Sequence, residues 1–214
     1  GGIDQAPLSV GGIPLDELAA DHVTTVLGRG HYMGDGGSSH EAELTFPPQV
    51  DGLTFSSDGR YLFFADGARI RRIHLSTGEI HTVAGTGDPG VRNGPTLTAR
   101  LLHPRELVGD EKTLYFSETG INANRIRKVD LESGQVTTLI GSVNPRHRGF
   151  RGDGGPASEA WINGPRHLNV LEDGDLLFLD RGNCRIRKVD ARRGIVETIA
   201  DNDCALGDGI PTSA

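Results

Sequence analysis

The chain has 214 residues, which is long enough for one large domain or two small ones with a sizeable hydrophobic core. Its formal net charge of −7 at pH 7 argues against a broad surface for nucleic acid, while leaving room for a local basic patch. The 31 glycines and 11 prolines follow no collagen-like period, so they indicate many short strands joined by tight turns. No apolar run approaches the roughly 20 residues that a transmembrane helix needs.

A lead-in segment at residues 1–20 lacks the basic and apolar stretches of a signal peptide and is typical of a processed or trimmed terminus. A first unit of four predicted strands follows it. Polar turns separate the strands, and no helical periodicity lies between them. Four short antiparallel strands of this kind are typical of one propeller blade. The strand sequences are "GLTFS" (52–56), "YLFFA" (61–65), "RIRRIH" (69–74) and "IHTVA" (80–84).

The same series of landmarks occurs three times, in repeats at about 28–85, 85–141 and 141–200. Each repeat has a glycine after a β-rich run, then an alanine, a proline, an acid after an apolar strand, and an arginine in a basic run. Each repeat therefore predicts one four-stranded blade. In that order, the landmarks are Gly28, Gly85 and Gly141; Ala42, Ala99 and Ala160; Pro47, Pro104 and Pro165; Asp66, Glu118 and Asp180; and Arg71, Arg127 and Arg187.

Partial units are predicted at both ends. Residues 21–28 match a fourth strand whose own blade lacks its other strands, and "GDGIPTSA" at 207–214 begins a further repeat over 201–214. Residues 21–214 are therefore expected to form a propeller segment of about three and a fraction blades, fewer than the about four that a closed ring needs. We expect it to be part of a longer chain. A ring assembled from two chains is less favoured, because it would make the strand at 21–28 redundant.

Residues 152–190, "GDGGPASEAWINGPRHLNVLEDGDLLFLDRGNCRIRKVD", distinguish between the families with four-stranded blades. The GH…WD pair and the kelch double glycine are both missing from the chain. The segment closely resembles the NHL repeat, in its longer bacterial-type form with a GDGG loop. The resemblance implies an all-β propeller, usually of about six blades. It also implies a platform for protein binding, and it favours a periplasmic or extracellular location that the residues themselves leave open.

The arginine of each basic run lies on the third predicted strand, where neighbouring blades cover both faces of the sheet. A buried guanidinium is costly unless it is paired. Each repeat supplies an acid at the end of the adjacent strand, so we predict structural ion pairs rather than a grip for phosphate. The predicted pairs are Asp66 with Arg71, Glu118 with Arg127, and Asp180 with Arg187.

Neither a metal nor a cofactor is expected. Each GDGG loop, at 34–37 and 152–155, offers one aspartate, which is too few oxygen ligands for calcium. Glycines that permit a positive φ in the crossover between blades are the better explanation of the loop. The two cysteines, Cys184 and Cys204, occupy different places in the repeats, which favours free thiols over a single bridge.

Sites on propellers tend to lie where the innermost strands begin. Arg105, Arg166 and His167 follow the repeat proline at this place and differ between repeats. The third crossover, "NPRHRGFRG" at 144–152, is longer than its siblings and basic, which indicates either a solvated loop or a contact for an anionic partner. Its candidate binding residues are Arg146, His147, Arg148 and Arg151.

Some NHL-like propellers are peptide-amidating lyases that hold zinc through one histidine from each of several inner strands. Here His103 and His167 are out of register, which makes a poor zinc ring, and no G-x-S-x-G elbow supports hydrolysis. We therefore expect a non-catalytic scaffold that binds a protein partner, with the remaining blades supplied by the same or another chain. The alternatives are a lyase or hydrolase with catalytic residues partly in further blades, and an RNA-binding domain, which the negative charge disfavours.

Overall fold

The computed structural model describes residues 9–10, 13–14, 35–42, 44–45, 52–120 and 123–201. A short antiparallel pair, β1 (Ser9–Val10) and β2 (Ile13–Pro14), stands at the start of the chain. The strand predicted at 21–28, and the predicted further repeat beyond residue 201, lie outside the described residues. Within those residues, no helix is long and apolar enough to cross a membrane.

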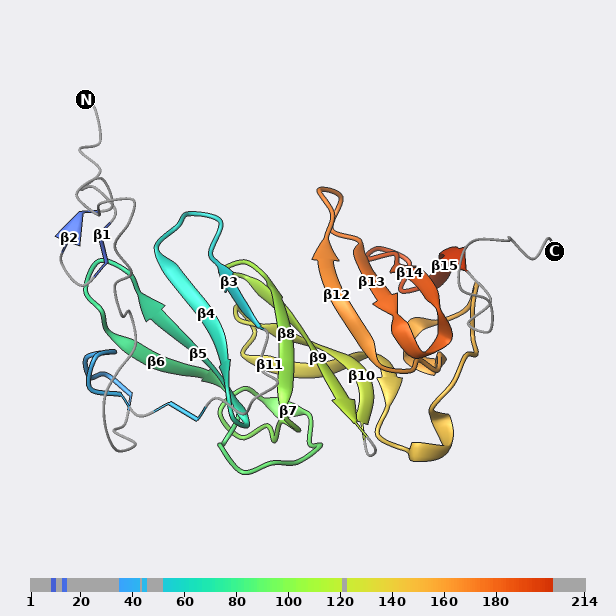
Figure 1. Cartoon of the computed structure of the whole chain (residues 1–214), viewed down its shortest axis with the longest axis horizontal. Helices are drawn as coiled ribbons and strands as arrows, with labels where there is room; N and C mark the ends of the chain where they lie inside the picture. Colours follow the sequence, from blue (N-terminus) through green and yellow to red (C-terminus); the bar gives the residue numbers. More distant parts are fainter. Residues whose placement is uncertain are drawn as a thin grey trace.

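Three antiparallel sheets follow one another along the chain and stand side by side (Figure 1). Consecutive strands pair within each sheet, because short turns with glycine connect them. Blade 1 comprises β3 (Leu53–Phe55), β4 (Tyr61–Asp66), β5 (Arg69–His74) and β6 (Ile80–Ala84). Blade 2 comprises β8 (Pro104–Gly109), β9 (Thr113–Gly120), β10 (Ala123–Asp130) and β11 (Gln135–Ser142). Blade 3 comprises β12 (Pro165–Val170), β13 (Leu176–Asp180), β14 (Arg185–Val189) and β15 (Val196–Asp201).

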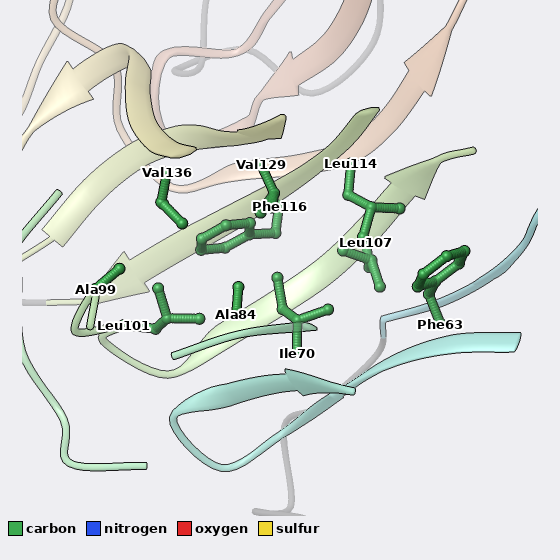
Figure 2. Packing of buried hydrophobic residues seen from close by; sticks show 10 residues of the cluster. All are labelled: Phe63, Ile70, Ala84, Ala99, Leu101, Leu107, Leu114, Phe116, Val129 and Val136. Carbon is green, nitrogen blue, oxygen red and sulfur yellow. The ribbon is translucent and has the colours of Figure 1, made fainter. Parts of the chain in front are cut away.

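The blades stack face to face through apolar seams. At the first seam, Phe63 of blade 1 lies beside Leu107 of blade 2, and Ile70 of blade 1 lies near Phe116 of blade 2, as Figure 2 shows. At the second seam, Ile126 of blade 2 belongs to the same buried cluster as Phe178 of blade 3. Blade 2 therefore buries both of its faces, and such stacking of four-stranded sheets defines a partial β-propeller.

The first strands of consecutive blades are also neighbours. The hydroxyl of Thr54 on β3 donates to the carbonyl of Gly109 on β8 at 3.5 Å. The amide of Leu168 on β12 donates to the Glu106 carboxylate on β8 at 3.1 Å. The second contact holds β8 and β12 side by side at the second seam.

The strands β1, β2 and β7 were not predicted. β7 (Gly94–Pro95) lies in the second crossover and pairs with β11, so that blade 2 has five strands. The other crossovers make single bridges of the same kind, at Ser38 with Glu79 and at Pro156 with Ile195. Each crossover thus covers the outer edge of the blade that follows it, which protects a strand edge that would otherwise be open to solvent.

The three arginines on the third strands are fully buried, each with 0% of its surface exposed. Each forms an ion pair with the acid at or near the end of the second strand of its blade. That acid also accepts a hydrogen bond from the backbone amide of Thr45, Leu102 or Asn163, which ties the segment before the inner strand to the same network. The ion-pair distances are 3.3 Å for Arg71–Asp66, 2.9 Å for Arg127–Glu118 and 3.4 Å for Arg187–Asp180.

A second partner for each arginine comes from the crossover, through the aspartate of the GDGG loop or its counterpart. This residue accepts from the arginine and also from a threonine on the fourth strand of the blade. The arginine contacts are Arg71 to Asp35 at 3.2 Å, Arg127 to Asn93 at 2.9 Å and Arg187 to Asp153 at 3.2 Å. The threonines are Thr82, Thr138 and Thr198. The side chain of the crossover aspartate or asparagine is therefore engaged by residues of its own blade.

Burial shifts the pKa of one charged group in each of two of these pairs. It lowers the pKa of the Arg127 guanidinium, and the nearby Glu118 carboxylate opposes that shift. It raises the pKa of the Asp180 carboxyl, against hydrogen bonds from Asn163, Asn183 and Arg187 that favour the charged form. The shifts show that burying the pairs is costly, and that the surrounding hydrogen bonds offset part of the cost.

Asp153→Ala is expected to lower the free energy of unfolding by about 1–2 kcal/mol, because the partly exposed carboxylate takes hydrogen bonds from Arg187 and Thr198. Asp153→Asn is expected to cost less than about 1 kcal/mol, since Asn93 serves the same arginine contact in blade 2. Thermal unfolding in calcium and in EDTA measures both effects. Stabilisation of the parent by calcium, lost in Asp153→Asn, would contradict the structural role.

The expectation of free thiols is wrong, because Cys184 is disulfide-bonded. It stands in the turn before β14 and has a left-handed backbone, with φ of 50°. The argument from the repeats failed because a single bridge joins one pair of positions and needs no counterpart in the other blades. Cys204, the second cysteine of the chain, lies outside the described residues.

Candidate functional site

Two inner strands are irregular at the residues that follow the repeat proline. The pairing of β8 with β9 shifts register between Pro104 and Leu107, and that of β12 with β13 shifts between Arg166 and Asn169. A β-bulge re-aims the side chains within it and is common beside binding sites. Both bulges lie at the same end of the second seam.

A hollow of about 320 Å³ opens at this end of blades 2 and 3. Four arginines from four separate segments line it, together with asparagine, threonine and glycine residues. Among the described residues that line it there is no aspartate or glutamate. We call it the arginine hollow. Its arginines are Arg105 of β8, Arg148 of the third crossover, Arg166 of β12 and Arg181 of η4 (Arg181–Asn183).

The asparagines of the arginine hollow hold its walls together. Asn124 accepts a hydrogen bond from the Gly164 amide at 2.8 Å and donates to the Gly120 carbonyl at 3.0 Å. Asn163 accepts from the Nε atom of Arg148 at 2.8 Å, which fixes the crossover arginine against blade 3. These side-chain amides are engaged within the protein, so the arginines give the hollow its positive charge.

A second hollow of about 560 Å³ adjoins the first and shares Arg166 and Arg181 with it. Its other lining residues come from the two inner strands: Glu106, Leu107, His167 and Leu168. We call it the inner-strand hollow. It combines apolar, cationic and acidic side chains at the point where the first strands of two blades meet.

Glu106 links the two inner strands. It accepts the Leu168 amide at 3.1 Å, and its carboxylate lies 3.8 Å from the Arg166 guanidinium. His167, between these two residues of β12, is exposed and has a left-handed φ of 52°. Such a backbone is uncommon outside glycine, and it persists where the surroundings impose it. The bulge thus holds an exposed histidine beside a tethered carboxylate and an arginine.

The basic residues of the third crossover separate into two groups. Only Arg148 reaches the arginine hollow. The His147 ring stacks on Trp161 at 4.6 Å, and the Arg151 guanidinium lies 5.3 Å from the same ring. Arg146 is exposed on η2 (Pro145–His147). The predicted inner-strand residues Arg105, Arg166 and His167 all line one or both hollows.

Arg181 is a residue of the site that sequence reasoning missed. It directly follows the strand-end acid Asp180, where the other blades have Gly67 and Thr119. This departure from the repeat was a signal that could have identified it. Within the part of the chain that the structure describes, no three His, Cys, Asp or Glu side chains gather as metal ligands.

Four-stranded blades, stacked through both faces around neighbouring inner strands, make the protein a β-propeller segment. No protein-family model matches the chain. It is 30% identical to NHL repeat-containing protein 2 of Bos taurus over 180 residues, covering 74% of this chain and 24% of the relative. It is 28% identical to Protein SUPPRESSOR OF QUENCHING 1, chloroplastic, of Arabidopsis thaliana over 187 residues, covering 81% of this chain and 17% of the relative.

Among solved structures, a protein of unknown function from Bacteroides thetaiotaomicron is similar, with a TM-score of 0.52 and 21% identity over 70% of this chain. The alignment covers 35% of that protein, and the likeness concerns the fold. The chain belongs to the NHL-repeat β-propeller family. It spans about a quarter or less of the length of the two curated relatives.

Proposed function

We propose that this segment is a non-catalytic binding module, which holds a protein partner at the end of the blades where β8 and β12 begin. The convergence of four arginines from four separate segments on the arginine hollow carries this proposal. Arg148 and Arg181 are exposed at this seam and can contact a partner, whereas the third-strand arginines are fully buried and paired inside each blade. The assignment to a family of protein-interaction platforms supports the same function.

The outer faces of the end blades define a second set of contacts in this proposal. On blade 1, Leu53 is 60% exposed, whereas Leu107 at the corresponding place in blade 2 is 6% exposed beneath blade 1. On blade 3, Ile186 is 40% exposed, whereas the corresponding Ile126 is fully buried by blade 3. We propose that further NHL-type blades, from the same or another chain, cover these two faces in the way that the described blades cover each other.

Site-specific photo-crosslinking tests the proposed binding face. A photoreactive phenylalanine analogue replaces His167, which is exposed beside the hollows, and a control places it at Asp173 in the turn at the opposite end of blade 3. We expect a discrete protein adduct from position 167 and none from position 173. Equal adducts from both positions would contradict the proposal. Stoichiometric zinc or calcium in the purified full chain would favour a lyase or hydrolase instead.

A further inference from the structure

The charge balance at the arginine hollow defines the chemistry of its ligand. Four arginines line it, of which Arg148 and Arg181 are exposed, and the described lining residues include no carboxylate. The acid of the adjoining hollow, Glu106, is already engaged by Arg166 and by the Leu168 amide. Since a cationic hollow of this kind attracts and orients anions, the ligand carries negative charge at this position.

The opposite end of the seam between blades 2 and 3 is acidic rather than basic. A separate hollow of about 360 Å³ there is lined by Asp110 of the turn after β8 and by Tyr115 of β9. Burial raises the pKa of the Tyr115 hydroxyl, and the negative charges of Asp110 and Asp130 raise it further. The seam is therefore polarised along its length. In a chain with a net charge of −7, an acidic partner is repelled by most of the surface and directed to the arginine end.

The inner-strand hollow supplies an apolar complement. Leu107 and Leu168 line it beside the shared arginines Arg166 and Arg181. The described residues around the two hollows include no Phe, Tyr or Trp on which a nucleic-acid base would stack. A ligand that fits both hollows has carboxylates close to an apolar side chain, a combination that an acidic peptide segment provides.

We propose that the two hollows together bind an extended acidic peptide of the partner protein, with its carboxylates at Arg148 and Arg181 and a neighbouring apolar side chain against Leu168. This proposal rests on the proposed function and specifies its ligand. Arg148 and Arg181 confer the specificity for anions, and they come from segments that differ from those of the other blades. Neither is part of the buried pairs that support each blade.

Fluorescence anisotropy with the full chain tests the inference. The probes are a labelled peptide with adjacent glutamates followed by leucine, and the same peptide with glutamines. We expect the glutamate peptide alone to bind, and Arg148→Gln and Arg181→Gln each to weaken its binding about tenfold, as expected for loss of one charged hydrogen bond. Arg192→Gln, which removes the same charge in the turn before β15, is the matched control and is expected to bind as the parent does.

Equal binding of the glutamine peptide, or equal weakening by Arg192→Gln, would overturn the inference. Stronger displacement by an RNA oligonucleotide than by unlabelled glutamate peptide would also overturn it. Matched melting curves for the three variants show that a loss of binding is not a loss of folding. If position 167 cross-links a partner but the glutamate peptide does not bind, the inference fails and the proposed function stands. If the peptide binds through Arg148 and Arg181 but no partner is captured, the proposed function fails alone.

Discussion

Arg127→Ala is expected to lower the free energy of unfolding by about 3–5 kcal/mol, the usual cost of removing one member of a buried ion pair. The guanidinium has no exposed surface and donates to the Glu118 carboxylate, to the Asn93 side chain and to two backbone carbonyls. Its removal takes one donor from each of these acceptors in a site that excludes water, although Glu118 keeps its ion pair with Arg125. Chemical denaturation followed by tryptophan fluorescence measures the loss.

Lys128→Ala is the control, because Lys128 is the next residue on β10 and makes only a partly exposed ion pair at 3.8 Å with Asp130. We expect this substitution to cost less than about 1 kcal/mol. An Arg127→Ala protein that unfolds like the parent but no longer binds a ligand would contradict the structural role. That result would return the third-strand arginines to the phosphate interpretation.

Gly141→Ala is expected to destabilise the chain by at least about 3 kcal/mol, of which about 1–2 kcal/mol comes from the left-handed backbone, with φ of 89°. The remainder comes from a collision, because a Cβ atom at this position would lie 2.2 Å from the Asn124 carbonyl oxygen and 2.7 Å from the Arg125 Cα atom. Both atoms belong to the backbone of β10, so rotation of a side chain offers no relief. The midpoint of chemical denaturation measures the effect.

Gly134→Ala separates the two causes. Gly134 also has a positive φ, of 66°, but no atom lies within 4 Å of the position of a Cβ atom. We expect it to cost only the left-handed backbone penalty of about 1–2 kcal/mol. Equal destabilisation by the two substitutions would mean that β10 and β11 separate easily, contrary to the close packing at Gly141.

The architecture could be predicted from sequence because the repeats present it three times. The strand-end acid and the third-strand arginine occupy fixed places in each repeat, and adjacent antiparallel strands must bring them together. The crossover partner was harder to find. Blade 2 has Asn93 where the others have Asp35 and Asp153, and Asn93 is one residue closer to the repeat alanine than those aspartates are, so the sequence pattern does not repeat at this position. The contact also depends on the path of the crossover along the outer edge, which no local propensity specifies.

The candidate site was accessible to sequence reasoning only in part. Arg105 and Arg166 could be found because they follow a proline at a recognisable strand start. The cluster at 146–151 gave no indication of which side chain faces which neighbour, since successive residues of a turn point in different directions. Thus Arg148 lies in the arginine hollow, whereas Arg151 lies against Trp161. Repetition identifies what each blade needs for folding, and departures from it mark residues free to serve binding.

The attachment of each crossover to the blade that follows it sets the natural boundaries for folding. In blade 3, the buried network runs from Asp153 through Asp180 and Arg187 to Thr198, all within one continuous stretch of chain. A nascent blade can therefore neutralise its buried arginine as soon as its own fourth strand has been synthesised. A truncation just before Asp153 would spare blade 2, whereas one between Asp180 and Arg187 would leave the Asp180 carboxylate without its guanidinium partner. The folding unit therefore comprises a blade together with the crossover that precedes it, and not the four strands of the sheet alone.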